Sequence, residues 1–241
     1  MNHQNLVHVH VGKCAGSTLN TCLHEAGVSF VELHGHGADK QLEAILDLGV
    51  SEINYIITIR DPISRFISAF WYDKHRALTG QGPAITRLEE RLWTMVFTHF
   101  PHPSALAEGL ESAQEGTRVL AAKAMSPQYR SHMGLGLSAY ITPALIQRLP
   151  KDKAFLIRQE MAAVDIRMVF SAMGLRKPGN VPRINNFQSL HSREFGAVAD
   201  ARTLSETAQS ALRSWLREEF HVFGLLLKAF GNQSKLEKLA E

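Results

Sequence analysis

The chain has 241 residues, 45% of them hydrophobic and 20% charged, which is the balance of a globular protein with a sizeable core. No apolar run approaches the ~20 residues of a membrane-spanning helix, and residues 1–16 lack the pattern of a signal peptide. The two cysteines, Cys14 and Cys22, form no disulfide framework, so we expect a cytoplasmic protein. The net charge is +3 without a block of basic residues, so we expect no nucleic-acid partner.

Strand and helix patterns alternate through the first 78 residues. Short apolar strands are predicted at 6–11 and 28–33, and NYIITIR (54–60), rich in β-branched residues, is the clearest strand. A helical spacing of apolar residues follows each strand, at 18–26, at 40–48 and after Asp61-Pro62. This order predicts right-handed βαβ units and a parallel sheet.

The rest of the chain is mostly helical in pattern. Residues 83–149 carry helical spacing broken by prolines, a strand is predicted at 154–157, and helices are predicted at about 160–173 and 205–230. No repeat or linker divides the chain. We therefore predict one α/β domain over residues 1–241, with a parallel sheet flanked by helices and a helical insertion at about 83–149.

The segment HVGKCAGSTL (10–19) joins the first predicted strand to the first predicted helix, which is where parallel α/β sheets bind phosphate. Its small residues let the backbone close around an anion, Lys13 adds a positive charge, and Ser17 and Thr18 add hydroxyl donors. The lysine precedes the small residues, so the segment is not the Walker A pattern GxxxxGK[ST]. From spacing alone, a tight turn with a surface lysine is the alternative.

A second candidate anion site, RDPISRFIS (60–68), follows the clearest strand. Arg60 stands at the carboxyl end of the strand, and Ser68 lies two turns into the next helix. An arginine fork with a serine hydroxyl suits a terminal phosphate. Taken alone, a solvated Arg60 beside a helix-capping Asp61 is the alternative.

Both segments resemble those of sulfotransferases that use 3′-phosphoadenosine 5′-phosphosulfate. The first is similar to the 5′-phosphosulfate loop of that family, commonly HIPK(T/C)(G/A)G(T/S)(S/T)L, with Gly12 in place of the usual proline. The resemblance implies that Lys13 contacts the bridging oxygen of the sulfate donor. It also implies that the 5′-phosphate is bound by Ala15, Gly16, Ser17 and Thr18.

The second segment matches the 3′-phosphate motif RDPxxRxxS of the same family, which implies Arg60 and Ser68 as ligands. Arg65 also matches, either as a ligand or as a brace for the helix. VPRINN (181–186) resembles a late loop that covers the nucleotide, which adds Arg183 and Asn185. The family implies a P-loop-like sulfotransferase fold, with 3′-phosphoadenosine 5′-phosphate as the product nucleotide.

Six of the 12 histidines fall within the first 36 residues. His34-Gly35-His36 follows the second predicted strand and resembles the HGH tripeptide of heparan sulfate 2-O-sulfotransferase and its relatives. The resemblance implies that His36 is the general base for the acceptor hydroxyl and that His34 supports it or contacts the substrate. Without the resemblance, two solvated loop histidines are the alternative.

His8 and His10 alternate on one predicted strand, so their side chains share a face. With His34 and His36 they would offer imidazoles to a transition metal. No carboxylate or Cys pair stands at a conventional spacing, and the loop motif already accounts for His10, so the sequence predicts no metal.

The sequence thus predicts an enzyme that transfers a sulfuryl group to the hydroxyl of a carbohydrate or small-metabolite acceptor, with specificity set by residues 83–149. One alternative is a P-loop-type nucleotide or small-molecule kinase, against which the position of Lys13 argues. The other is a non-catalytic nucleotide-binding module, against which the combination of Lys13 and HGH argues. The pattern leaves the acceptor and the oligomeric state open.

Overall fold

The computed structural model describes residues 5–79, 87–129, 131–182 and 203–231. The chain divides into two compact units. The first comprises residues 1–61, 137–184 and 221–241, and the second comprises residues 62–136 and 185–220. The second unit thus contains much of the insertion expected at 83–149, but it begins earlier and takes in a later segment. That the chain forms one domain stays a prediction.

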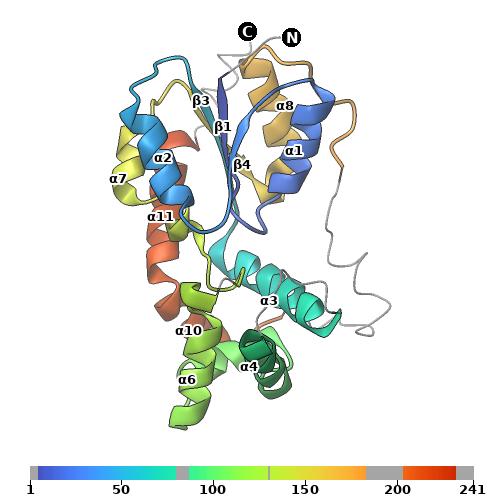
Figure 1. Cartoon of the computed structure of the whole chain (residues 1–241), viewed down its shortest axis with the longest axis vertical. Coiled ribbons are helices and arrows are strands. Elements are labelled where there is room, and N and C mark those ends of the chain that lie inside the picture. The colour runs from blue at the N-terminus through green and yellow to red at the C-terminus, as the bar shows by residue number, and fades with distance from the viewer. Residues whose placement is uncertain (1–4, 80–86, 130, 183–202, 232–241) are drawn as a thin grey trace. The chain divides into compact units, whose positions relative to one another are not determined.

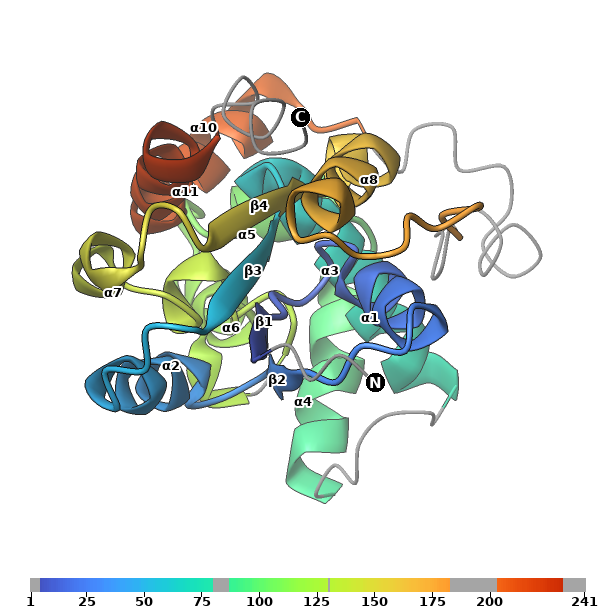
Figure 2. The ribbon, with the colours of Figure 1, turned by 90° about the horizontal axis from the view of Figure 1, so that it is seen from above.

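The first unit is built on a four-stranded, all-parallel sheet with the strand order β2-β1-β3-β4 (Figures 1 and 2). The strands are β1 (Leu6–Val9), β2 (Val31–Leu33), β3 (Asn54–Ile59) and β4 (Ala154–Arg158). All four predicted strands are present, although β1 and β2 are shorter than expected. The sheet is sandwiched between helices, which explains why β1, β3 and β4 are buried along nearly their whole length.

Helices cover both faces of this sheet, as Figures 1 and 2 show. One face carries α1 (Gly16–Glu25) and α8 (Ala162–Ala172), and the opposite face carries α2 (Ala38–Asp47) and α7 (Pro143–Arg148). On the first face, apolar side chains of α1 and α8 share a buried cluster with those of the strands, among them Leu19, Ile56 and Phe170. The predicted α/β class with a parallel sheet is therefore confirmed.

The second unit is helical throughout its described part. Its helices are α3 (Pro62–Thr79), α4 (Arg87–His99), α5 (Pro103–Gly109), α6 (Glu115–Ala124), α10 (Glu206–Trp215) and the first residues of α11 (Arg217–Phe230). They enclose an aromatic core in which the ring of Phe70 meets Trp71 and Phe97 edge-on, with centroids 5.3 and 5.5 Å away. None of the described helices in either unit is long and apolar enough to cross a membrane.

The helix predicted over 205–230 is two helices. Residue Leu216, between α10 and α11, has φ −90° and ψ 20°, which leaves the α-helical region, and its side chain is buried in the core of the second unit. Leu212, Leu216 and Phe220 keep helical spacing across the break. Periodicity alone therefore does not show the break.

Candidate functional site

The loop between β1 and α1 contains two residues in the left-handed backbone conformation. Lys13 has φ 69° and Ala15 has φ 66°, and they are the only non-glycine residues with positive φ in the described part of the chain. This conformation costs a residue with a Cβ roughly 1–2 kcal/mol and is retained where the surrounding structure enforces it. Mixed left- and right-handed residues turn successive N–H groups to one side, which makes a concave site for an anion.

Several contacts hold this loop in place. Arg60, which follows β3, donates from Nη1 to the carbonyl oxygen of Lys13 over 3.4 Å. The buried Cys14 thiol contacts the Gly12 carbonyl at 3.7 Å. A Cβ on Gly16 would lie 1.9 Å from Cδ2 of His10, so only glycine fits there. Arg60 thus connects the loop to the residue after β3, and Gly16 packs closely against the His10 ring.

The N-terminus of α1 has no side-chain cap. Ala15 occupies the cap position and makes no side-chain hydrogen bond. The first N–H groups of a helix have no partner within the helix, and the helix dipole favours an anion there. Ser17 is half-buried and Thr18 is buried in this first turn. The structure therefore places the Arg60 guanidinium at the backbone carbonyl of Lys13, three residues before α1 begins.

The remaining predicted nucleotide ligands lie elsewhere in the chain. Ser68 is half-buried on α3, which belongs to the second unit. Arg183 and Asn185 lie outside the described residues. Their proposed roles stay predictions from the resemblance.

The HGH tripeptide follows β2 in the first unit. Nδ1 of His34 is 2.8 Å from the carbonyl oxygen of His10, and the His34 and His10 rings lie 4.4 Å apart. His36 is exposed, in a turn between Gly35 and Gly37, which have φ 81° and 79°. These two glycines permit a turn that leaves the His36 imidazole accessible to a substrate. His34 thus contacts His10, the first residue of the 10–19 segment, and His36 follows in the adjoining turn.

A network of polar side chains connects β1, β2 and α1 on the α1 side of the sheet. Nδ1 of His8 is 2.7 Å from Oδ1 of Asn20, whose Nδ2 donates to Oε1 of Glu32 over 2.8 Å. The same Glu32 oxygen pairs with Nδ1 of His10. The rings of His8 and His10 are parallel within 6°, with centroids 5.1 Å apart. Sequence reasoning did not place Asn20 or Glu32 beside His8, because only strand pairing brings Glu32 there.

The charges of this network follow from burial and hydrogen bonding. Burial, aided by the charge of His10, lowers the pKa of His8 to about 3, so His8 is neutral at physiological pH. Burial alone raises the pKa of Glu32, but hydrogen bonds from His10 and Asn20 outweigh that effect and bring it below the ordinary value. Glu32 is therefore an anion beside a neutral His8.

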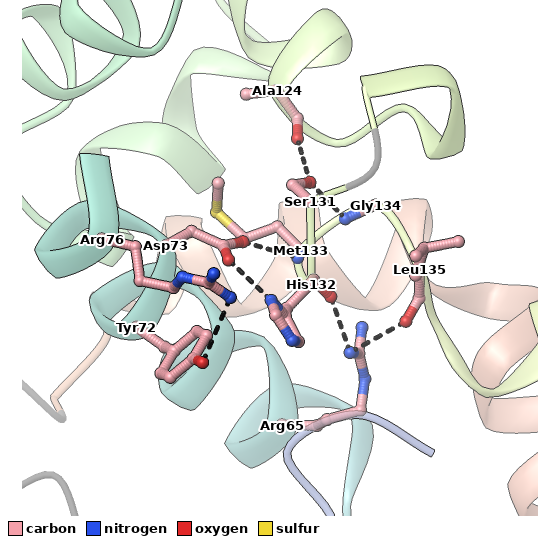
Figure 3. Close-up of polar contacts among 10 residues, drawn as sticks. All are labelled: Arg65, Tyr72, Asp73, Arg76, Ala124, Ser131, His132, Met133, Gly134 and Leu135. Carbon is pink, nitrogen blue, oxygen red and sulfur yellow. Dashed lines mark hydrogen bonds and ion pairs between the residues drawn. The ribbon is translucent and has the colours of Figure 1, made fainter. Parts of the chain in front are cut away.

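Arg65 acts as a brace in the second unit. It is 2% exposed, and its Nη1 donates to the carbonyl oxygens of His132 at 2.8 Å and Leu135 at 3.2 Å (Figure 3). On the same helix, the Asp73 carboxylate accepts from Nδ1 of His132 over 2.8 Å and from the N–H of Met133 over 3.1 Å. Of the two roles that the sequence left open for Arg65, the structure supports the brace.

The fold and this site define an α/β protein with an all-parallel sheet and a strained, cation-flanked loop before its first helix. Comparisons with protein-family models, with curated proteins and with solved structures find no match to the chain.

Proposed function

We propose that the chain is an enzyme, a sulfotransferase that moves the sulfuryl group of 3′-phosphoadenosine 5′-phosphosulfate to an acceptor hydroxyl. The observation that carries the proposal is the strained loop before α1, which contains Lys13 and is contacted by Arg60. Backbone strain at non-glycine residues is typical of sites that bind ligands, and N–H groups at a helix start favour phosphate. The order of residues in the loop supports a sulfate donor over ATP.

In the proposed reaction, His36 takes the proton of the acceptor hydroxyl while its oxygen attacks sulfur. The bond between sulfur and the bridging oxygen breaks, and 3′-phosphoadenosine 5′-phosphate leaves. Lys13 and the N–H groups of the loop stabilise the negative charge that develops on the bridging oxygen, by the same electrostatic principle as in phosphoryl transfer. Residues 15–18 would hold the 5′-phosphate, and the resemblance assigns Arg60 and Ser68 to the 3′-phosphate.

The same proposal extends to the rest of the molecule. The fold would be the P-loop-like fold of sulfotransferases, with Arg183 and Asn185 covering the nucleotide. The acceptor would be a carbohydrate or small metabolite, and the enzyme would act in the cytoplasm. Tyr140, within the predicted insertion, has its ring 6.1 Å from that of His34, which supports a role for that segment beside the acceptor.

A thermal-shift comparison tests the nucleotide. A ligand that binds only the folded chain stabilises it by about 2.7 kcal/mol at a hundredfold excess over its dissociation constant. We expect 3′-phosphoadenosine 5′-phosphate to raise the melting temperature and AMP, which lacks the 3′-phosphate, to raise it much less. Equal shifts from ATP and the bisphosphate would favour a kinase, and no shift from the bisphosphate would reject the proposal.

Substitutions of Arg60 and Lys13 separate nucleotide binding from sulfuryl transfer. Arg60→Ala should weaken bisphosphate binding by about ten- to a hundredfold, because a charge-assisted phosphate contact contributes roughly 1.5–3 kcal/mol. Arg60→Lys keeps the positive charge but loses the forked guanidinium group. Lys13→Ala should slow transfer more than it weakens binding of the product nucleotide. Lys40→Ala, an exposed change on α2, is the control. Binding of the bisphosphate without transfer to any acceptor would favour the non-catalytic module.

A further inference from the structure

We infer that His8, His10 and Glu32 form a binding site for one divalent transition-metal ion of the zinc class, on the α1 side of the β1–β2 pair. Each residue offers one ligand atom, and these atoms lie within 4.8 Å of one another. The inference is independent of the proposed sulfotransferase activity, because none of the three residues has a role in that reaction.

Strand pairing explains why these three side chains meet. His8 and His10 stand two residues apart on β1 and its extension, so both point to the α1 side. The parallel register places Glu32 of β2 directly opposite His8. The carboxylate that the sequence lacked at a conventional spacing is therefore supplied by the neighbouring strand.

The second nitrogen of His8 is a buried polar atom that still lacks a partner. This Nε2 atom is buried and has no hydrogen-bond partner, and the whole residue is 0% exposed. The Glu32 carboxylate only accepts hydrogen bonds, so the amide nitrogen of Asn20 must face it and the amide oxygen must face His8. His8 therefore carries its proton on Nδ1, and Nε2 has an unused lone pair.

An unused lone pair in the interior is unfavourable unless something binds it. Leaving a buried polar atom without a partner costs about 1–3 kcal/mol. A metal ion would satisfy Nε2 of His8 without a proton, and imidazole is a good ligand for zinc and its neighbours.

Hydrogen bonds around the cluster fit a metal site as well. Histidine ligands usually donate their other ring N–H to an oxygen that fixes the ring, and Asn20 does this for His8. Asn20 also donates to Glu32, so one side chain orients two of the three ligands. The donor set of two imidazoles and one carboxylate suits zinc, with a fourth position for water.

Binding requires a modest closure of the cluster. Ligand atoms at 2.0–2.1 Å from zinc stand about 3.3 Å apart in a tetrahedron, so the side chains must approach further. The parallel rings of His8 and His10 cannot both point at one ion until one of them turns. The His10 and Glu32 side chains, 12% and 36% exposed, would have to move to close around the ion, whereas Asn20 fixes His8. The ion would replace the hydrogen bond between His10 and Glu32.

Calorimetric titration of the metal-stripped full chain with Zn²⁺ tests the site, with Co²⁺ absorption as a second readout. We expect one equivalent to bind, a visible Co²⁺ band of low-symmetry coordination, and a higher melting temperature with Zn²⁺. Glu32→Gln keeps the shape of the side chain and should weaken Zn²⁺ binding at least tenfold, as should His8→Ala. Asn20→Ala should weaken it by about ten- to a hundredfold through loss of ligand orientation.

His24→Ala removes an exposed histidine of α1 outside the cluster and should leave Zn²⁺ binding unchanged. Circular dichroism shows whether each variant is folded. If His8→Ala does not fold, the Zn²⁺ affinity of Glu32→Gln decides whether the cluster binds the metal. Absence of binding, or equal affinity in wild type and Glu32→Gln, would overturn the inference. Neither result involves the nucleotide, so the proposed sulfotransferase activity would be unaffected by it.

Discussion

Individual residues of the loop before α1 carry conformations that their residue types do not favour. Glycine would adopt the left-handed backbone at positions 13 and 15 without steric cost, yet the chain places Lys13 and Ala15 there. At position 13 the side chain supplies a cation beside the uncapped helix. A cation at position 13 is what the proposed phosphosulfate site would use, whereas nothing in the structure explains Ala15 in place of glycine.

Gly16 is the position in this loop where a side chain is least tolerated. Gly16→Ala would place a Cβ 1.9 Å from the His10 ring and 2.2 Å from its Nε2. We expect a loss of roughly 1–3 kcal/mol of unfolding free energy in urea, the usual effect of overpacking. Gly116→Ala is the matched control, because its Cβ would meet nothing within 4 Å on α6. Equal stability of the two variants would contradict the predicted clash.

His36 is the residue on which the proposed chemistry depends most directly. His36→Ala should lower turnover by about 10²–10⁴-fold, the usual effect of a general base, with little change in bisphosphate binding.

The measurement uses labelled donor with a panel of sugars and phenols as acceptors. His34→Ala should mainly raise the apparent KM for the acceptor, and His24→Ala should change neither parameter. Near-normal turnover of His36→Ala on a good acceptor would reject His36 as the base. The nucleotide assignment at Lys13 and Arg60 would survive that result.

At the scale of elements, α3 organises the segment that follows α6. Arg65 and Asp73 stand two turns apart on α3, and both bind backbone or side-chain atoms of residues 131–135 (Figure 3). Ser131 adds a local contact, since its hydroxyl donates to the Ala124 carbonyl over 3.2 Å and accepts from the Gly134 N–H over 2.9 Å. This segment has no helix or strand and is ordered by side chains instead.

Loss of the Arg65 donor should therefore be costly. Arg65→Met leaves the carbonyl oxygens of His132 and Leu135 without this donor in a buried place. We expect a loss of about 2–4 kcal/mol in urea unfolding followed by tryptophan fluorescence. Arg76→Met, which removes a 3.3 Å bond to the Tyr72 hydroxyl on the same helix, should lose less than about 1 kcal/mol. Comparable losses would mean that Arg65 does not brace the segment.

At the scale of the whole molecule, the two units contain different natural probes. Both cysteines, Cys14 and Cys22, lie in the first unit, and all three tryptophans, Trp71, Trp93 and Trp215, lie in the second. Both thiols are buried, and burial raises the pKa of the Cys22 thiol, which disfavours the reactive thiolate. Thiol labelling therefore reports opening of the first unit, and tryptophan fluorescence reports unfolding of the second.

We expect the two probes to give one coincident transition in urea. The chain passes between the units four times, and α11 continues from one unit into the other at Phe220 and His221. Because α11 contributes residues to both units, unfolding of either unit disrupts this helix. Coincidence of the two probes is the test for a single cooperative domain. Separate midpoints would instead establish two domains and contradict the prediction from sequence.

The sequence by itself determined the features that depend on near neighbours along the chain. The β-branched run at 54–60 predicts β3, and the strand-helix order predicts the parallel sheet. These follow because side chains one to four residues apart decide the face and the period of an element. The break at Leu216 was missed because helical spacing continues across it.

Only the tertiary structure decided which distant residues meet. The register of β1 and β2 sets Glu32 against His8, and the path of the chain after α6 places carbonyl oxygens at Arg65. The positive φ of Lys13 and Ala15 also depends on contacts from Arg60 and on the packing of His10 against Gly16. Pairing and packing between segments far apart in the chain leave no periodic signal in either segment alone, which is why the buried network became visible only in three dimensions.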